Sequence, residues 1–296
     1  MGNGYCCSKS NYTFGLYFDN SNNSSCSLLP TPYSLLPILL IAICSLLFFS
    51  CSRKTDAHVI IAGSTSIQPY VELLAEEYAL LYPDKNIDIQ GGGSSAGITA
   101  AENGVADIGM SSRYLKRTEE DLWSIEIARD GLAMIVHPDN PVSDLTMEQV
   151  RDIYTSTINN WSQLGGKHAR IHIIAREEGS GTRTAFEDMV MGNEYRITPR
   201  AIVQASNGAV RQLVAGDINS IGFISLGLVD HTVKALKLNG IAATRENVID
   251  GSYSLFRPFL FVSRSIPPAG SAMEFIEFIS SPEGRAIMIN EGLVPR

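Results

Sequence analysis

Short apolar stretches alternate with amphipathic segments from residue 58 to the end of the chain. Residues 58–62 (HVIIA) are apolar, which predicts a buried strand. In the segment that follows, apolar side chains recur at the spacing of one helical face, at Ile67, Val71, Leu74, Tyr78 and Leu81. Ser66 stands just before this face, where an N-cap residue is expected. A strand followed by an amphipathic helix is the repeating unit of an α/β fold.

The same alternation continues to the C-terminus. Further strands are expected at residues 87–90, 107–110, 131–136, 171–175, 221–225 and 253–262. Helices are expected between them, including one at residues 118–123, and two more helices complete the chain. The pattern therefore predicts an α/β protein.

Neither an internal repeat nor a Gly/Ser-rich linker interrupts the chain after residue 57. Two domains would then be joined by strands that cross from one to the other, near residues 136–140 and 255–258. This interpretation assigns residues 57–136 and 258–296 to lobe 1 and residues 137–257 to lobe 2. It also predicts a ligand cleft between the two lobes.

Four expected strands end in turns that are rich in Gly, Ser or Thr, at residues 63–66, 91–97, 111–113 and 176–183. Ligands of open α/β sheets bind at the carboxyl ends of strands. The last turn adds the guanidinium of Arg176 to the hydroxyls of Ser180 and Thr182. Hydroxyls, glycine backbone and a helix N-terminus together suit an oxyanion such as phosphate. The net charge of -8 argues against a nucleic acid partner.

The N-terminal segment has a different composition. Residues 35–50 are almost wholly apolar and lead to Cys51, which suits a signal peptide followed by a lipidated cysteine. We interpret residues 1–56 as a signal and lipoprotein segment with a tether, with residues 1–27 as a possible start-site artefact. An uncleaved membrane anchor is the alternative. Both interpretations place the remaining chain outside the cytoplasm, at a bacterial membrane. All five cysteines lie within the first 51 residues, so a cysteine-based metal site is not expected.

Four motifs, at residues 63–69, 92–98, 106–113 and 176–183, resemble in order and spacing the phosphate-binding proteins of bacterial ABC transporters. Residues 130–131, 160–161 and 221–223 also match, and the resemblance covers residues 58–296. It implies a two-lobed periplasmic-binding-protein fold, type II-like, in which helices flank a mixed sheet in each lobe. It further implies a monomer without cofactor that binds inorganic phosphate and delivers it to a permease and ATPase complex.

The resemblance also implies a set of phosphate-binding residues: Thr65, Ser66, Ser94, Ser112, Arg176, Ser180, Gly181 and Thr182. Ser64, Ser95, Arg113 and Glu178 would lie nearby, with Glu178 orienting the guanidinium of Arg176. Ser112 stands where some members carry an Asp that accepts the ligand's proton. Without that Asp, either another acidic group, such as Glu178 or Asp107, accepts the proton, or the site distinguishes phosphate from sulfate less well. We favour the second expectation.

Several alternatives remain open from the sequence. A binding protein for sulfate or molybdate would share the fold, and a sensor or adhesin could keep the anion site without a permease. Residues 93–97 (GSSAG) match the Gly-x-Ser-x-Gly turn of serine hydrolases. A hydrolase also needs a histidine base, but His168 follows a Gly-Gly loop and His172 lies within an expected strand. The histidines are scattered, and no metal site is expected.

Overall fold

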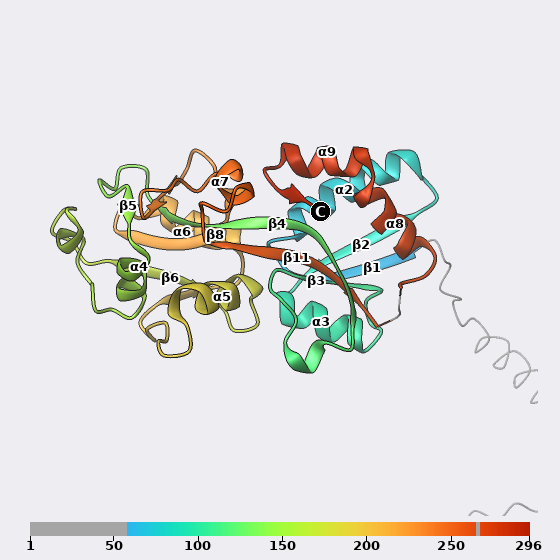
Figure 1. Cartoon of the computed structure of the whole chain (residues 1–296), viewed down its shortest axis with the longest axis horizontal. Helices are drawn as coiled ribbons and strands as arrows, with labels where there is room; N and C mark the ends of the chain where they lie inside the picture. The colour runs from blue at the N-terminus through green and yellow to red at the C-terminus, as the bar shows by residue number, and fades with distance from the viewer. Residues whose placement is uncertain (1–57, 265–266) are drawn as a thin grey trace, which may run out of the picture. The chain divides into compact units, whose positions relative to one another are not determined.

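The computed structural model describes residues 58–264 and 267–296. The predicted signal segment, Cys51 and the tether lie outside these residues. Strands and helices alternate in two lobes, and two long strands, β4 (Trp123–Val136) and β11 (Phe256–Ser263), run from one lobe to the other (Figure 1). The expectation of an α/β protein with two lobes is confirmed.

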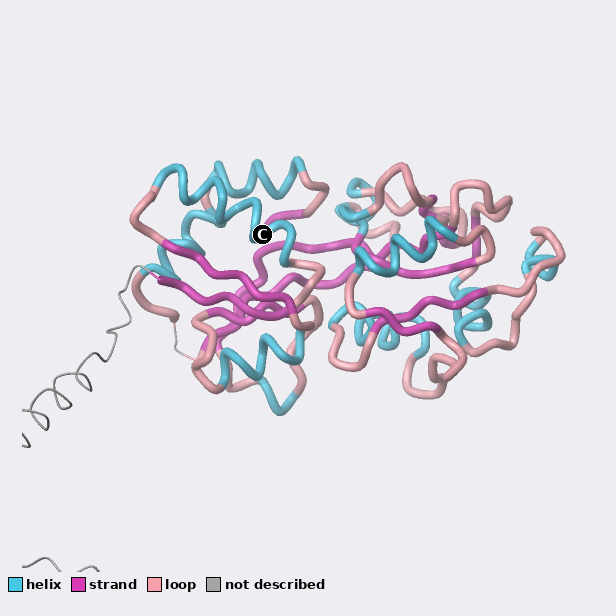
Figure 2. Tube along the Cα trace, turned by 180° about the vertical axis from the view of Figure 1, so that it is seen from behind, coloured by secondary structure: helices cyan, strands magenta, loops and turns pink. Residues whose placement is uncertain are grey.

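Lobe 1 is built on a mixed sheet with the order β2-β1-β3-β11 and then the first half of β4. β1 pairs in parallel with both β2 and β3, whereas β11 is antiparallel to β3 and β4. Helices flank this sheet on both faces (Figure 2). The elements of lobe 1, apart from β4 and β11, are β1 (His58–Gly63), α2 (Gln68–Leu81), β2 (Asn86–Gly91), α3 (Ser94–Glu102), β3 (Ile108–Ser111), the 3₁₀ helix Arg117–Glu119, α8 (Ser271–Ser280), α9 (Pro282–Asn290) and β12 (Val294–Pro295).

Lobe 2 continues the strand order with the second half of β4, followed by β8-β6-β7. β6 is parallel to β8 and β7, and β4 is antiparallel to β8. The elements of lobe 2 are β5 (Asp144–Leu145), α4 (Met147–Tyr154), the 3₁₀ helix Trp161–Leu164, β6 (His172–Arg176), α5 (Gly181–Phe186), the π-helix Glu187–Met191, β7 (Ile202–Gln204), α6 (Asn207–Gly216), β8 (Ser220–Ser225), the 3₁₀ helix Leu226–Leu228, β9 (Lys234–Ala235), β10 (Lys237–Leu238) and α7 (Arg245–Ile249).

The strand β4 changes its neighbour near its middle. Its first part pairs with β11 through Gly131, and its second part pairs with β8 from Leu132 onward. The side chains follow this change, because Ile127 and Ala128 belong to the core of lobe 1 and Leu132 to the core of lobe 2. The chain therefore enters lobe 2 at Leu132, ahead of the boundary after residue 136 that the hydrophobic pattern predicted. The return crossing begins at Phe256, which pairs with Gly131.

Three local predictions are wrong. The helix expected at residues 118–123 is only a short 3₁₀ turn, since β4 already begins at Trp123 and pairs there with Ser263. Leu81 ends the apolar face of α2 but is 60% exposed. Ser66 does not cap α2, because its hydroxyl is used by residues of lobe 2.

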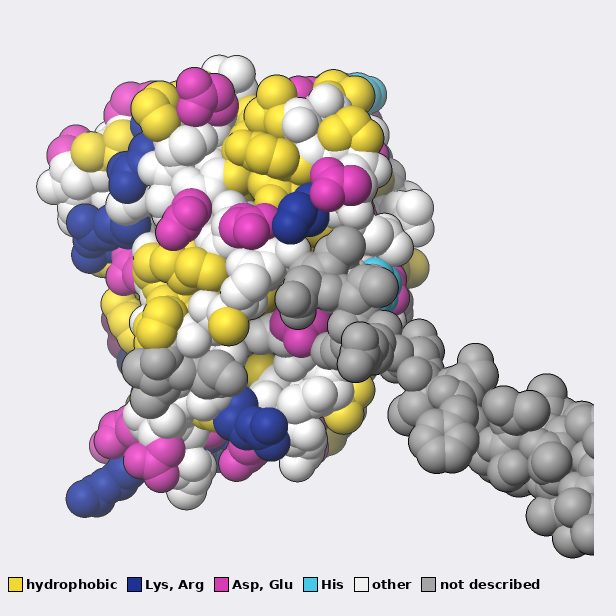
Figure 3. Space-filling view, turned by 90° about the vertical axis from the view of Figure 1, so that its right-hand side faces the viewer, with side chains coloured by type: hydrophobic (Ala, Val, Ile, Leu, Met, Phe, Trp, Pro, Cys, Tyr) yellow, Lys and Arg dark blue, Asp and Glu magenta, His cyan; other side chains and the backbone are white. Residues whose placement is uncertain are grey.

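The surface of the described residues is mixed in character. Figure 3 shows the outer end of lobe 1, where hydrophobic side chains are interspersed with acidic and basic ones. Within residues 58–264 and 267–296, every helix is too short or too polar to cross a membrane.

Candidate functional site

Four helix N-termini meet where the two lobes touch, at α2 and α3 from lobe 1 and at α5 and α6 from lobe 2. The Ser66 hydroxyl, just before α2, lies 2.8 Å from the Thr182 hydroxyl and accepts a hydrogen bond of 2.8 Å from the Asn207 amide. At α3, the backbone N–H of Ser95 donates to the carbonyl of Gly179 over 3.1 Å. Helix N-termini carry unpaired N–H groups and the positive end of the macrodipole. Their convergence makes this region attractive to an anion.

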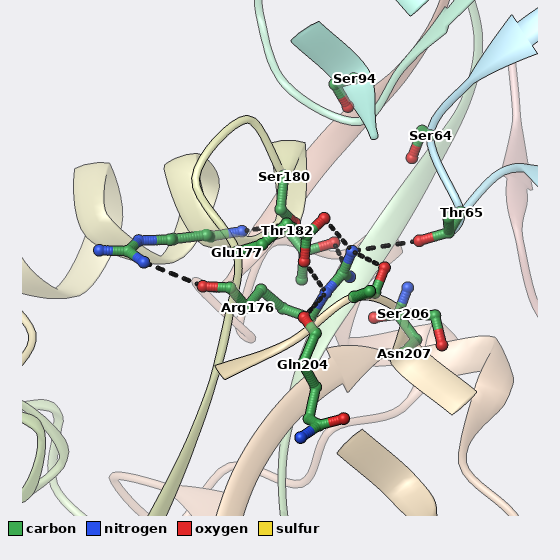
Figure 4. A network of polar contacts seen from close by, with 12 residues as sticks. Ser64, Thr65, Ser94, Arg176, Glu177, Ser180, Thr182, Gln204, Ser206 and Asn207 are labelled. Carbon is green, nitrogen blue, oxygen red and sulfur yellow. Dashed lines mark hydrogen bonds and ion pairs between the residues drawn. The ribbon is translucent and has the colours of Figure 1, made fainter. Parts of the chain in front are cut away.

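We call the residues that bring hydroxyls or cationic charge to this region the cage: Ser64, Thr65, Ser66, Ser94, Ser112, Ser180, Thr182 and Arg176. Arg176 is the last residue of β6 and only 1% exposed. Its Nη2 donates to the Thr65 hydroxyl over 3.1 Å, and its Nη1 to the Thr182 hydroxyl over 3.4 Å (Figure 4). One guanidinium therefore contacts both lobes.

The acidic partner of Arg176 is Glu177, which corrects the expectation that Glu178 orients the guanidinium. Nε of Arg176 donates to Oε2 of Glu177 and Nη2 donates to Oε1, each over 2.9 Å, so the pair is bidentate. Glu178 lies exposed in the turn that follows. The strand ends at Arg176, so Glu177 is free of the strict alternation of side chains and can fold back onto its neighbour. The carbonyls of Gln204 and Ala205 also accept from Arg176.

On the lobe 1 side, three serine hydroxyls form a buried cluster around Ser112. The Ser64 hydroxyl donates to Ser112 Oγ over 2.9 Å, and the Ser94 hydroxyl lies 3.3 Å away. The backbone N–H of Ser112 donates to Ser94 Oγ over 3.0 Å. The structure therefore brings Ser64, Ser94 and Ser112 together, although they follow three different strands.

Beneath Ser112 lies a second buried arginine that the sequence did not single out. Arg257, on β11, donates from Nη1 to Ser112 Oγ over 3.4 Å. Its Nε and Nη2 donate to Asp130 Oδ2 over 3.0 and 2.8 Å, and both side chains of the pair are 1% exposed. Asp130 Oδ1 accepts from the Ser225 hydroxyl over 2.7 Å. Burial raises the pKa of the Asp130 carboxyl, and Arg257 and Ser225 oppose that rise.

Arg113 lies beside the cage but is committed to another carboxylate. Its Nη1 and Nη2 donate to the two oxygens of Glu119 over 2.7 and 2.9 Å, and Nη2 also reaches Ser95 Oγ at 3.4 Å. These hydrogen bonds from Arg113 hold the pKa of Glu119 below its ordinary value. Arg113 and Ser95 thus lie together at the border of the cage.

Gly181 and Ser180 place lobe 2 directly against the serine cluster. Ser180 is the N-cap of α5, and its hydroxyl accepts from the backbone N–H of Arg183. A Cβ added to Gly181 would lie 2.2 Å from Ser94 Oγ and 2.6 Å from Ser112 Oγ. Only glycine allows the backbone to approach these hydroxyls so closely.

Sequence reasoning missed Glu177, Asn207, Asp130 and Arg257. A local signal for Asn207 is present in the sequence, because Ser206 just before it is a typical N-cap residue, and Ser206 does cap α6. Asp130 was part of a matched motif. Arg257 stood in an extended apolar segment with no local feature that marked it.

The two serines of the hydrolase motif have other partners: the Ser94 hydroxyl lies beside Ser112, and Ser95 accepts from Arg113. Among the described residues, His137 approaches Asp139 and His172 approaches Asp217. In the same part of the chain, no group of three or more His, Cys, Asp and Glu residues could hold a metal ion.

This chain is similar in sequence and in structure to several known proteins. The PBP superfamily domain matches residues 51–283. A crystal structure from Clostridium perfringens, assigned as a phosphate ABC transporter substrate-binding protein with bound phosphate, is 44% identical with a TM-score of 0.78. The match covers 81% of this chain and 99% of that one.

Two further relatives agree with this result. An ABC-type phosphate transport receptor from Vibrio cholerae is 37% identical with a TM-score of 0.68, and the match covers 80% of this chain and 100% of that one. The phosphate-binding protein PstS of Bacillus subtilis (strain 168) is 29% identical over 249 residues, which are 82% of each chain.

Proposed function

Since this chain belongs to the PBP superfamily as a PstS-like member with the type II fold, we propose that it binds inorganic phosphate and delivers it to an ABC permease and its ATPase. The observation that carries the proposal is the double engagement of Arg176. This buried guanidinium donates to Thr65 in lobe 1 and Thr182 in lobe 2, where four helix N-termini converge. A planar cation between hydroxyl donors and helix N-termini is suited to a tetrahedral oxyanion.

In this proposal phosphate is held by the eight residues that the resemblance implied. Thr65, Ser66, Ser94 and Ser112 act from lobe 1, and Arg176, Ser180, Gly181 and Thr182 act from lobe 2. Glu177 keeps the guanidinium in place through its bidentate contact. Binding uses groups from both lobes, so phosphate stabilises the closed arrangement in which the lobes touch. This is the property that a permease can recognise.

The experiment is calorimetric titration of the purified full chain, kept in detergent, with phosphate, sulfate and molybdate. We expect phosphate to bind with a dissociation constant at or below the micromolar range. Molybdate binding in preference to phosphate would assign the chain to another oxyanion. Absence of binding by all three would reject the proposed function.

We further propose that the chain acts outside the cytoplasm as a lipoprotein attached through Cys51. The apolar segment that precedes Cys51 supports this proposal. Mass spectrometry of the membrane-bound protein is the test. A mature chain that begins at a lipidated Cys51 is expected, whereas retention of residues 1–50 would establish an uncleaved anchor.

A further inference from the structure

The Ser112 hydroxyl is surrounded by donors. Its oxygen accepts from the Ser64 hydroxyl at 2.9 Å and from Arg257 Nη1 at 3.4 Å. A hydroxyl oxygen has two lone pairs, so these two donors occupy both of its acceptor positions. The proton of Ser112 is then directed either to Ser94 Oγ, 3.3 Å away, or to a ligand.

Arg257 cannot move away from this position at low cost. Two of its nitrogens donate to one oxygen of Asp130, and both side chains are almost completely excluded from solvent. The Ser225 hydroxyl holds the other oxygen of Asp130. A buried pair with these additional hydrogen bonds has a defined geometry, because separating it would leave two buried charges unpaired. Nη1 therefore stays directed at Ser112.

We propose that Arg257 is a positioning residue that fixes the Ser112 hydroxyl as a donor to the ligand. The cage then does not favour a protonated oxyanion over an unprotonated one. This inference rests on the proposed function. A ligand P–OH group facing Ser112 finds no acceptor there for its own proton, whereas an unprotonated, charged oxygen accepts the Ser112 hydrogen bond without leaving a donor unpaired. Sulfate, which carries no proton near neutral pH, is therefore accepted alongside phosphate.

The test is the ratio of the dissociation constants for sulfate and phosphate, measured by calorimetric competition on the full chain. Arg257→Lys keeps a positive charge opposite Asp130 but removes the planar fork that reaches Ser112. The double variant Asp130→Leu/Arg257→Met removes both charges, which proteins often tolerate well. In each variant the Ser112 hydroxyl can rotate, and its oxygen can accept a hydrogen bond from the phosphate P–OH group. We expect the ratio to rise by about three- to tenfold, the value of one neutral hydrogen bond.

Arg211→Lys is the matched control, because Arg211 pairs with Asp230 at 3.1 Å and both side chains are about one-third exposed. It should leave the ratio unchanged. A purely structural role for Arg257 would weaken both anions equally, and an unchanged ratio in a folded variant overturns the proposal. Failure of both Arg257 variants to fold would also overturn it, since Arg257 would then be a structural residue. Absence of phosphate binding by the natural protein would instead reject the proposed function.

Discussion

Two buried arginines donate to hydroxyls of the cage, but the fold holds them in different ways. Arg176 pairs with its neighbour in sequence, Glu177, whose side chain is 29% exposed. Arg257 pairs with Asp130 across two strands, and both side chains are 1% exposed. The first pair stands at the contact between lobes, and the second lies beneath Ser112 in the crossing strands.

This difference indicates how the cage divides its tasks. A partly exposed carboxylate can orient Arg176 while the guanidinium remains available to a ligand. A completely buried pair has only protein partners, so Arg257 acts on a ligand through Ser112. We therefore expect changes at the Arg176 pair to alter affinity first, and changes at the Arg257 pair to alter stability first.

The largest effect is expected from Asp130→Ala. Removal of this carboxylate leaves the Arg257 charge buried and unpaired, which should lower the free energy of unfolding by about 3–5 kcal/mol. Urea denaturation followed by circular dichroism measures the loss. Glu177→Ala is the matched comparison and should cost only about 1 kcal/mol, because its side chain is partly solvated and Arg176 keeps two carbonyl acceptors. Equal losses would contradict the contrast between the pairs.

Arg176→Ala should weaken phosphate binding about a hundredfold or more. A guanidinium can make two parallel charge-assisted hydrogen bonds, each worth about 1.5–3 kcal/mol. Calorimetric titration with phosphate measures the change. Arg196→Ala removes an exposed arginine from the same lobe and should bind phosphate as the natural protein does. If the affinity of the Arg176 variant were unchanged, Arg176 would not belong to the binding site.

Gly181→Ala should interfere with the contact between lobes. The added methyl group would lie 2.2 Å from Ser94 Oγ and 2.6 Å from Ser112 Oγ, and both hydroxyls belong to lobe 1. We expect phosphate affinity to fall about tenfold, because overpacking typically costs about 1–3 kcal/mol. Gly216→Ala is the control, since nothing lies within 4 Å of its added Cβ. Similar affinities for the two variants would mean that binding does not require this close approach.

The smallest effect concerns the pH dependence of stability at Glu119. Hydrogen bonds from Arg113 lower the pKa of Glu119 from its ordinary value of 4.5. The stabilisation of the folded state by the Arg113–Glu119 pair is therefore complete above about pH 4.5. It is lost as the pH falls through the lowered pKa that Glu119 has in the folded state. As the pH falls from 7 to 3, the measured free energy of unfolding should decline less for Glu119→Gln than for the natural protein. The difference should be under about 1 kcal/mol. Glu120→Gln, at an exposed position, should follow the natural protein.

The alternation of strands and helices, and the turns that contain the cage residues, could be predicted from the sequence. Hydrophobic periodicity reflects local burial, so the strand over residues 221–225 and the first three turns of α2 were predictable. N-caps at Thr146, Ser206 and Ser281 also depend on local sequence, because the capping side chain bonds a backbone N–H three residues further along. The composition of the turn from Arg176 to Thr182 predicts an oxyanion ligand, and that assignment stays a prediction.

Which groups from different strands meet depends on the packing of the strands and lobes in three dimensions. Arg257 and Asp130 are 127 residues apart, and their pairing depends on the register between β11 and β4, which no local pattern encodes. The sequence predicted Ser66 as a helix cap, but its hydroxyl forms hydrogen bonds with Thr182 and Asn207 of lobe 2 instead. The choice between Glu177 and Glu178 depended on where β6 ends. Spacing along the chain identifies the residues that can reach a site, whereas three-dimensional packing selects their partners.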